Sequence, residues 1–174
     1  MGDTVMTIIA IVVVAVLMLV YPLLNMAENN ETVVQMSVQT LTSEFVNTVT
    51  TEGRITVNVY NDFIQNLHAL EPGFEVEIEV QHIDENPGKA TVITHSDAIG
   101  ENLTFSVFTS SIVDMLEDEG VYVLSRGDFI IVNVRNTNRT IAQMLRDFFF
   151  SFTGASYRTL TASETGMVVN NGRR

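Results

Sequence analysis

The stretch Thr4–Leu24, TVMTIIAIVVVAVLMLVYPLL, has 21 residues and no charged side chain. As a helix it spans roughly 32 Å, close to the hydrocarbon core of a bilayer. Its β-branched residues would also suit a buried strand, but strands usually stop near ten residues. We therefore predict that residues 1–24 form a transmembrane or filament-core helix. The residues expected to face lipid or neighbouring subunits are Ile8, Ile11, Val12, Val16, Leu19 and Pro22.

A cleaved secretory signal is the main alternative for this stretch. Such signals have a basic start, an apolar run of about 7–15 residues and a cleavage site of small residues. Here Met1–Asp3 lacks Lys and Arg, the run is longer, and NMAENN at 25–30 is a poor cleavage site. These features favour a retained helix. Because no basic residue precedes Arg54, nothing holds the following domain in the cytoplasm. We expect a single-pass membrane protein whose C-terminal domain is extracellular.

Residues 25–52 continue the helix with a different surface. Apolar residues recur there at spacings of four, three, four and four, which places them on one helical face. Gly53 is a suitable helix terminator, and Pro22 predicts a kink. The simplest interpretation is one kinked helix from about Thr4 to Thr51; the alternative is two helices joined by a linker at 25–30. The residues expected to pack on the domain are Val34, Val38, Leu41, Phe45 and Val49.

Residues 53–174 form the predicted globular domain. A helical stripe runs from Tyr60 to Leu70, with Thr56 as its N-cap. Alternation from Phe74 to Val80 predicts a strand that has apolar residues on one face and glutamates on the other. A further short helix is expected around 110–119, with Ile112, Val113 and Leu116 facing inward.

The remaining elements of the domain follow from shorter patterns. ATVIT at 90–94 is a candidate partner for the strand at 74–80, and 121–136 is interpreted as a hairpin turning at 125–128. Residues 138–152 have a helical pattern, and the tail predicts two short strands. The predicted fold class is therefore α+β: a long N-terminal helix packed on a small antiparallel sheet of about four or five strands, with two or three short helices.

Charge is distributed unevenly along the chain. The net charge is -12, which argues against nucleic acid as a partner. Residues 1–119 hold 18 acidic and two basic side chains, whereas 120–174 hold three acidic and seven basic ones. Chance surface composition explains such asymmetry, but so does head-to-tail contact between copies. The candidate subunit contacts are Glu75, Glu77, Glu79, Arg135, Arg139 and Arg146.

The sequence contains no pattern typical of catalysis or cofactor binding. With no cysteine, a Cys-ligated zinc site and a thiol nucleophile are excluded. The pairs His82/Asp84 and His95/Asp97 do not form a cluster with a full set of metal ligands. Arg126–Asp128 matches an integrin-binding tripeptide, yet Gly-Asp also suits a turn. We therefore expect no enzymatic activity, no cofactor, no metal and no small-molecule substrate.

The plan of the chain resembles that of type IV pilins and pseudopilins, and more narrowly TadE-like minor pseudopilins of Gram-positive bacteria. The motifs that carry the resemblance are the apolar N-terminus, TTEGRIT (50–56), YNDFIQNLHAL (60–70), EVEIEVQHIDENPGK (75–89), GDFIIVNVRNTNRTIAQMLRDFF (127–149) and ETGMV (164–168). The resemblance implies a helix that holds the subunit in the membrane and, in some members, later packs in a filament core. It implies partners that are lipid and other copies or pilin-like subunits.

The chain also departs from this family. Family pilins have a basic leader that is cut after a glycine, and a glutamate five residues further on. A cut after Gly2 would leave Thr7 at that place, so the glutamate is absent. This departure favours an accessory role over that of a major pilin. The alternative function is a single-pass surface protein whose extracellular domain binds a ligand without polymerising.

Overall fold

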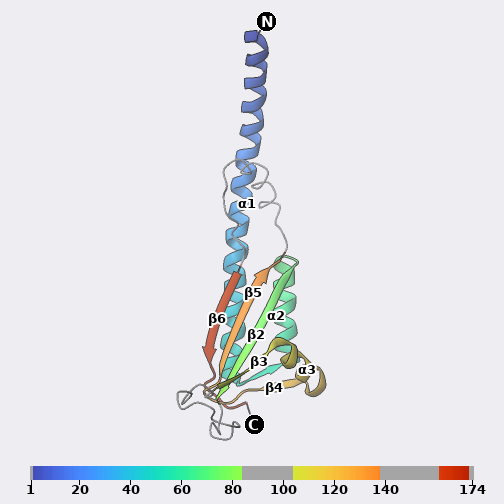
Figure 1. The fold of residues 1–174 in the computed structure, drawn as a ribbon, viewed down its shortest axis with the longest axis vertical. Coiled ribbons are helices and arrows are strands. Elements are labelled where there is room, and N and C mark those ends of the chain that lie inside the picture. Colours follow the sequence, from blue (N-terminus) through green and yellow to red (C-terminus); the bar gives the residue numbers. More distant parts are fainter. Residues whose placement is uncertain (1, 84–103, 138–160, 173–174) are drawn as a thin grey trace, which may run out of the picture.

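The computed structural model describes residues 2–83, 104–137 and 161–172. It confirms the α+β prediction of a long N-terminal helix on a small antiparallel sheet (Figure 1). The described elements are α1 (Gly2–Glu52), β1 (Arg54–Thr56), α2 (Val57–Leu70), β2 (Phe74–Ile83), β3 (Thr104–Phe108), α3 (Thr109–Glu119), β4 (Val121–Val123), β5 (Phe129–Asn136) and β6 (Thr161–Met167).

Helix α1 is continuous over 51 residues, a length of about 75 Å. Pro22 lies inside it, although proline removes a backbone donor and disfavours a helix interior. Because residues 25–30 are helical, the alternative of two helices joined by a linker is wrong. The helix ends at Gly53, whose φ of 69° is in the left-handed region that favours glycine.

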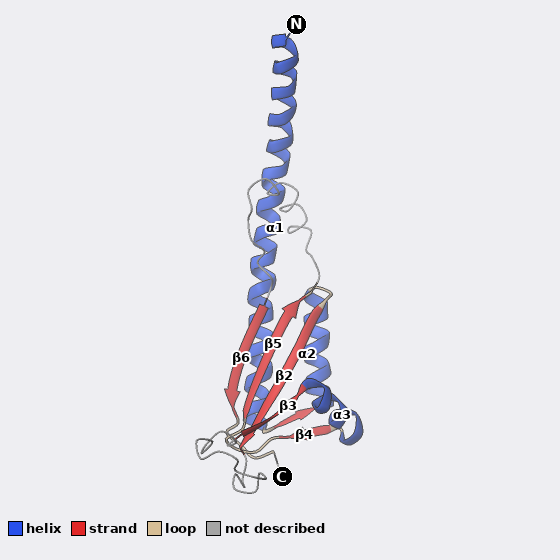
Figure 2. Cartoon of the chain, in the orientation of Figure 1, coloured by secondary structure: helices blue, strands red, loops and turns tan. Residues whose placement is uncertain are grey.

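Two antiparallel sheets make up the β structure of the described residues. The larger sheet has the strand order β3-β2-β5-β6, and β1 pairs with β4 in the smaller one. Helices α1 and α2 lie side by side on one face of the larger sheet (Figure 2). In β2, Ile78 and Val80 are buried toward these helices, while Glu75 and Glu77 point to the opposite face. The alternation therefore divides the sheet into an inner apolar face and an outer face.

The predicted hairpin at 121–136 is wrong. Its first half, β4, pairs with β1 through Ile55↔Tyr122, and its second half, β5, pairs with β2 and β6. The carboxylate of Asp128 accepts the backbone N–H of Ser125 and so closes a tight turn between the two sheets. Local β propensity marks strands but does not choose their partners, which are set by distant segments.

The C-terminal pattern also folds differently from the prediction. β6 is a single strand over Thr161–Met167, where two short strands were expected. β3 at Thr104–Phe108 pairs with β2, and no strand was predicted there. The predicted strand at 90–94 and helix at 138–152 lie outside the described residues.

The short helices agree with the sequence pattern. Thr56 is the N-cap of α2, since its hydroxyl accepts the backbone N–H of Val59 at 3.3 Å. In α3, Ile112 and Leu116 are buried and Val113 is half-buried. Gly120 ends α3 with a φ of 76°.

Candidate functional site

The N-terminal half of α1 projects away from the domain as a bare apolar rod (Figure 1). The segment Gly2–Leu23 is long and apolar enough to cross a membrane. Every described side chain in it is exposed, which apolar residues rarely show in water over such a length. The predicted membrane or filament-core residues are all exposed here: Ile8, Ile11, Val12, Val16, Leu19 and Pro22.

The C-terminal half of α1 is built into the domain. It packs against β6, β5 and α2. Five residues were predicted to form this contact. Val38, Phe45 and Val49 are buried, and Val34 and Leu41 are half-buried against the core. The ring of Phe45 stacks on that of Phe63 in α2, with centroids 4.4 Å apart.

The buried face of α1 is wider than the apolar pattern indicated. Thr42, Val46 and Thr50 are also buried on it. Threonine is tolerated there because its hydroxyl bonds to the preceding turn; that of Thr42 donates to the carbonyl of Val38 at 2.8 Å. The small residue Gly166 of β6 lies over this face. A Cβ atom added to Gly166 would come within 2.7 Å of side-chain carbons of Val46 and Thr50.

The C-terminal tail caps the end of α1. The last carbonyls of a helix have no partner within it. Here Val169 N–H donates to Thr50 O at 3.1 Å, and Asn170 Nδ2 donates to Thr51 O at 2.7 Å. A Cβ on Gly53 would collide with the backbone of Asn170 and Gly172. The tail therefore fastens the helix end to the domain, a role that the tail residues did not suggest in the sequence.

The predicted subunit contacts are only partly described. Glu75 and Arg135 are cross-strand neighbours on the outer face, and their side chains form an ion pair of 2.8 Å within the chain. Both are well exposed, and the carboxylate raises the pKa of Arg135. Glu77 is exposed, and hydrogen bonds from Ser106 and Gln81 lower the pKa of Glu79. Arg139 and Arg146 lie outside the described residues.

A buried polar network joins the two sheets. His82 Nδ1 lies 2.7 Å from Asp128 Oδ2, and His82 Nε2 lies 2.6 Å from the hydroxyl of Tyr122. Burial and the nearby Asp128 raise the pKa of Tyr122 to about 12, so the phenol stays protonated at neutral pH. In neutral His82, Nδ1–H donates to the carboxylate and Nε2 accepts from the phenol. These residues are 40 or more positions from His82, so sequence spacing did not reveal them.

This network serves structure better than catalysis. Tyr122 and Asp128 are 5% and 1% exposed, which leaves no room for a substrate at either group. The same burial removes Asp128 from the surface, so the Arg126–Asp128 tripeptide does not present its carboxylate for adhesion. Within the described ranges, no cluster of His, Asp or Glu has the number of ligands a metal requires.

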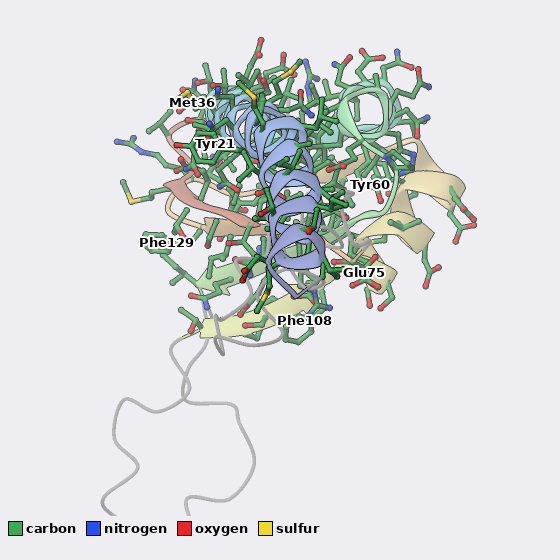
Figure 3. All side chains as sticks on the ribbon, turned by 90° about the horizontal axis from the view of Figure 1, so that it is seen from above. Tyr21, Met36, Tyr60, Glu75, Phe108 and Phe129 are labelled. Atoms are coloured by element: carbon green, nitrogen blue, oxygen red, sulfur yellow. The ribbon has the colours of Figure 1, made fainter. Side chains whose placement is uncertain are left out.

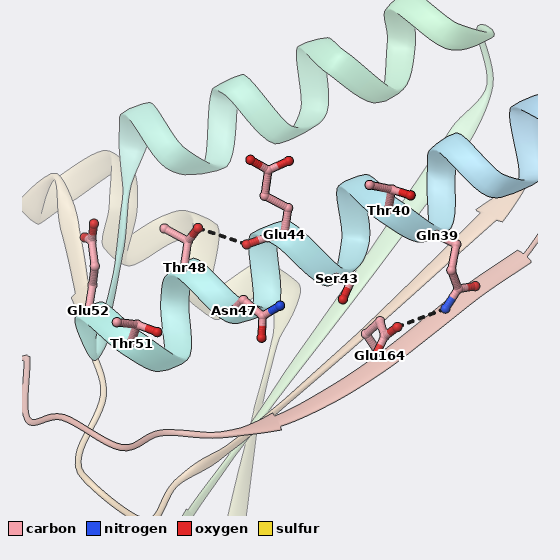
Figure 4. A pocket seen from close by; sticks show the side chains of 9 residues that line it. All are labelled: Gln39, Thr40, Ser43, Glu44, Asn47, Thr48, Thr51, Glu52 and Glu164. Carbon is pink, nitrogen blue, oxygen red and sulfur yellow. Dashed lines mark hydrogen bonds between the residues drawn. The ribbon is translucent and has the colours of Figure 1, made fainter.

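A groove with a volume of about 810 Å³ follows the polar back of α1 (Figure 4). Hydroxyl, amide and carboxylate groups line it. Its one crossing contact is Gln39 Nε2 donating to Glu164 Oε1 at 2.9 Å. Its titratable side chains, Glu44, Glu52 and Glu164, are not buried. The groove lining is Gln39, Thr40, Ser43, Glu44, Asn47, Thr48, Thr51, Glu52 and Glu164.

These residues form an exposed apolar helix that continues without a break into a folded domain. Neither a family model, nor a curated protein, nor a solved structure matches the chain.

Proposed function

We propose that this protein is a membrane-anchored, pilin-like structural subunit or accessory component of a surface filament or of a secretion- or conjugation-type apparatus. The N-terminal half of α1 would sit in the membrane and, in an assembled state, among the helices of other subunits. The domain would lie outside the cell. The partners are lipid and further pilin-like subunits.

One observation carries this proposal: α1 is a single helix whose first half is bare and whose second half is part of the domain core. A simple membrane tether needs only a flexible link between its anchor and its domain. A continuous helix fixes the direction of the domain relative to the rod. That rigidity suits a subunit that must be placed in register with its neighbours.

An accessory role fits the N-terminus better than that of a major pilin. A glutamate in a membrane helix costs free energy because its carboxylate loses water, so it is expected only where it pairs with a group on a neighbouring subunit. Thr7 stands where the resembling family has that glutamate, and its hydroxyl bonds to the carbonyl of Asp3 within the same helix. The second candidate, a non-polymerising surface receptor, uses the same anchor, and the outer face of the sheet would then bind its ligand.

Membrane topology can be tested with single cysteines, because the chain has none of its own. Asn61→Cys lies on the exposed side of α2 and Asp3→Cys at the start of the rod. In intact cells a membrane-impermeant maleimide should label Asn61→Cys, and it should label Asp3→Cys only after lysis. Buried Leu67→Cys should stay unlabelled in the folded protein. A water-soluble protein that carries Asn61 inside the cell would refute the proposal.

Assembly is tested separately from topology. In native membranes treated with a mild oxidant, full-length protein with Val12→Cys should form a disulfide-linked dimer, because each chain then has one thiol. A sheared surface fraction should contain filaments or the apparatus that includes the chain. Glu52→Cys, on the same helix but beside the domain, is the matched control. A strictly monomeric protein in membranes and in mild detergent would instead support the receptor.

A further inference from the structure

The back of α1, the side turned away from the sheet, keeps one repeating pattern after the membrane segment ends. Residues on it follow one another at alternating spacings of three and four, which is the seam of a coiled coil. These residues, named here the back stripe, are Met26, Asn29, Val33, Met36, Thr40, Ser43 and Asn47. The same spacing continues into the apolar rod at Val5, Ile8, Val12, Ala15, Leu19 and Pro22. One seam therefore runs from the membrane segment to the groove behind the domain.

The apolar side chains of the back stripe are exposed. Met26 is 69%, Val33 61% and Met36 65% exposed, although all three come after the segment that could cross a membrane. In the view along the rod, Met36 lies on the opposite side of α1 from the sheet (Figure 3). Val38 is only two positions further on, but it is about 200° around the helix and fully buried. The described part of the domain therefore packs on one side of α1 and leaves the back stripe open.

The back stripe carries no charge. The chain has 21 acidic residues and a net charge of -12, yet none of the stripe positions is acidic or basic. The neighbouring Glu28 and Glu31 occupy other positions of the repeat. A helical face that meets only water normally carries charged residues. Two copies of an acidic chain repel each other where their carboxylates meet, so an uncharged stripe is a surface at which they can approach.

A second copy in the same membrane meets this surface in register. The two rods then point the same way and lie at the same depth. A two-fold axis parallel to the rods sets each stripe residue against its own counterpart and leaves both domains on the outside. Asn47 occupies a core position of the seam, where asparagine is used to fix register at a cost in stability. Outside the membrane this contact would bury on the order of 1,000 Å², the lower limit for a specific interface.

We infer that the back stripe pairs with the back stripe of a second copy, in register, as a parallel two-helix coiled coil that continues beyond the membrane. The inference rests on the membrane placement of the rod in the proposed function, and it names the partner and the face of α1 that meets it. The polar end of the stripe at Thr40, Ser43 and Asn47 makes the contact weak alone. Holding both copies in one membrane strengthens it by raising their effective concentration.

Disulfide scanning of single-cysteine variants of the full chain in lipid vesicles tests this contact. Under a mild oxidant, Met26→Cys, Val33→Cys and Met36→Cys should form dimers. Asn25→Cys and Asn30→Cys are exposed on the same stretch but off the seam, and they should give roughly fivefold less, because a disulfide needs Cβ atoms about 4 Å apart. Equal yields at all five positions would overturn the inference. A dimer of Val12→Cys without one at Val33 or Met36 would also overturn it, while leaving the proposed assembly of the rods intact.

Charge pairing across the axis makes the test independent of folding. In the Met36→Cys background, Val33→Glu and Val33→Lys should each lower the dimer yield on the order of tenfold, since like charges then face each other. Mixing the two variants should restore the yield as a heterodimer. The same pair of changes at Asn30 should alter the yield by less than about twofold. If Met36→Cys is protected from maleimide in the detergent-solubilised monomer and mixing restores nothing, the stripe is covered by its own chain and the inference fails.

Discussion

Replacing Phe45 by alanine should detach α1 from the rest of the domain. Phe45 is 4% exposed and stacks on Phe63 with an interplanar angle of 12°. Truncating a buried phenylalanine to alanine costs about 3–5 kcal/mol, through lost transfer free energy and the cavity left behind. Since a domain of this size is stable by roughly 5–15 kcal/mol, the change removes a large fraction of the stability.

The measurement is urea-induced unfolding of the full chain in mild detergent, followed by pulse proteolysis, which reports the folded fraction without a tryptophan. Met36→Ala is the matched control, because Met36 is on the same helix but 65% exposed, and it should change stability by less than about 0.5 kcal/mol. Hydrogen exchange in β6, which packs against α1, should become faster in Phe45→Ala and not in Met36→Ala.

A double-mutant cycle isolates the stacked pair from the rest of the core. Phe45→Ala and Phe63→Ala should be non-additive by about 0.5–1.5 kcal/mol, the coupling expected for a contacting aromatic pair. The packing argument is wrong if Phe45→Ala is no more destabilising than Met36→Ala. An additive cycle would show that the two rings contribute separately.

Three further changes test other parts of the attachment. Gly166→Ala should lower the free energy of unfolding in urea by about 1–3 kcal/mol, because the new methyl group meets side chains of Val46 and Thr50. In the double variant, Val46→Ala should recover part of this loss. If the effects of the two substitutions simply add, the contact between Gly166 and Val46 is not the cause. Asn170→Ala should cost about 0.5–1.5 kcal/mol by removing the bond to Thr51 O, whereas Asn61→Ala on the exposed side of α2 should cost less; equal effects would argue against a capping role. The raised pKa of Tyr122, about 12 against an ordinary 10, means that its neutral form stabilises the fold. That contribution is complete below pH 10 and is lost as the pH rises from 10 to 12, so wild type should lose more stability over this range than Tyr122→Phe, and parallel pH profiles would contradict the assignment.

Much of the fold follows from local patterns in the sequence. The length and polarity of Thr4–Leu24, followed by apolar residues at helical spacing up to Val49, predict a long helix with one bare half and one packed half. Alternation in Phe74–Val80 predicts a strand with a glutamate face, and Thr56 predicts the start of α2. Each of these features depends on neighbours within a few positions, where periodicity and capping are decided.

The candidate contacts were harder to predict because they join distant positions. Glu75 was expected to meet a basic residue of another copy, yet the register of β2 and β5 places Arg135 directly opposite it in the same chain. Likewise, nothing near His82 in sequence indicates Asp128 or Tyr122.

By itself, the sequence determined helices α1, α2 and α3 and strand β2, the apolar face of each, and that the first segment is apolar enough for a membrane. Only the tertiary structure decided that 121–136 is divided between two sheets and that the C-terminal tail caps α1. The physical reason is that hydrophobic periodicity is a property of consecutive residues. Strand pairing and capping by remote groups instead depend on which distant surfaces the collapsed chain brings together.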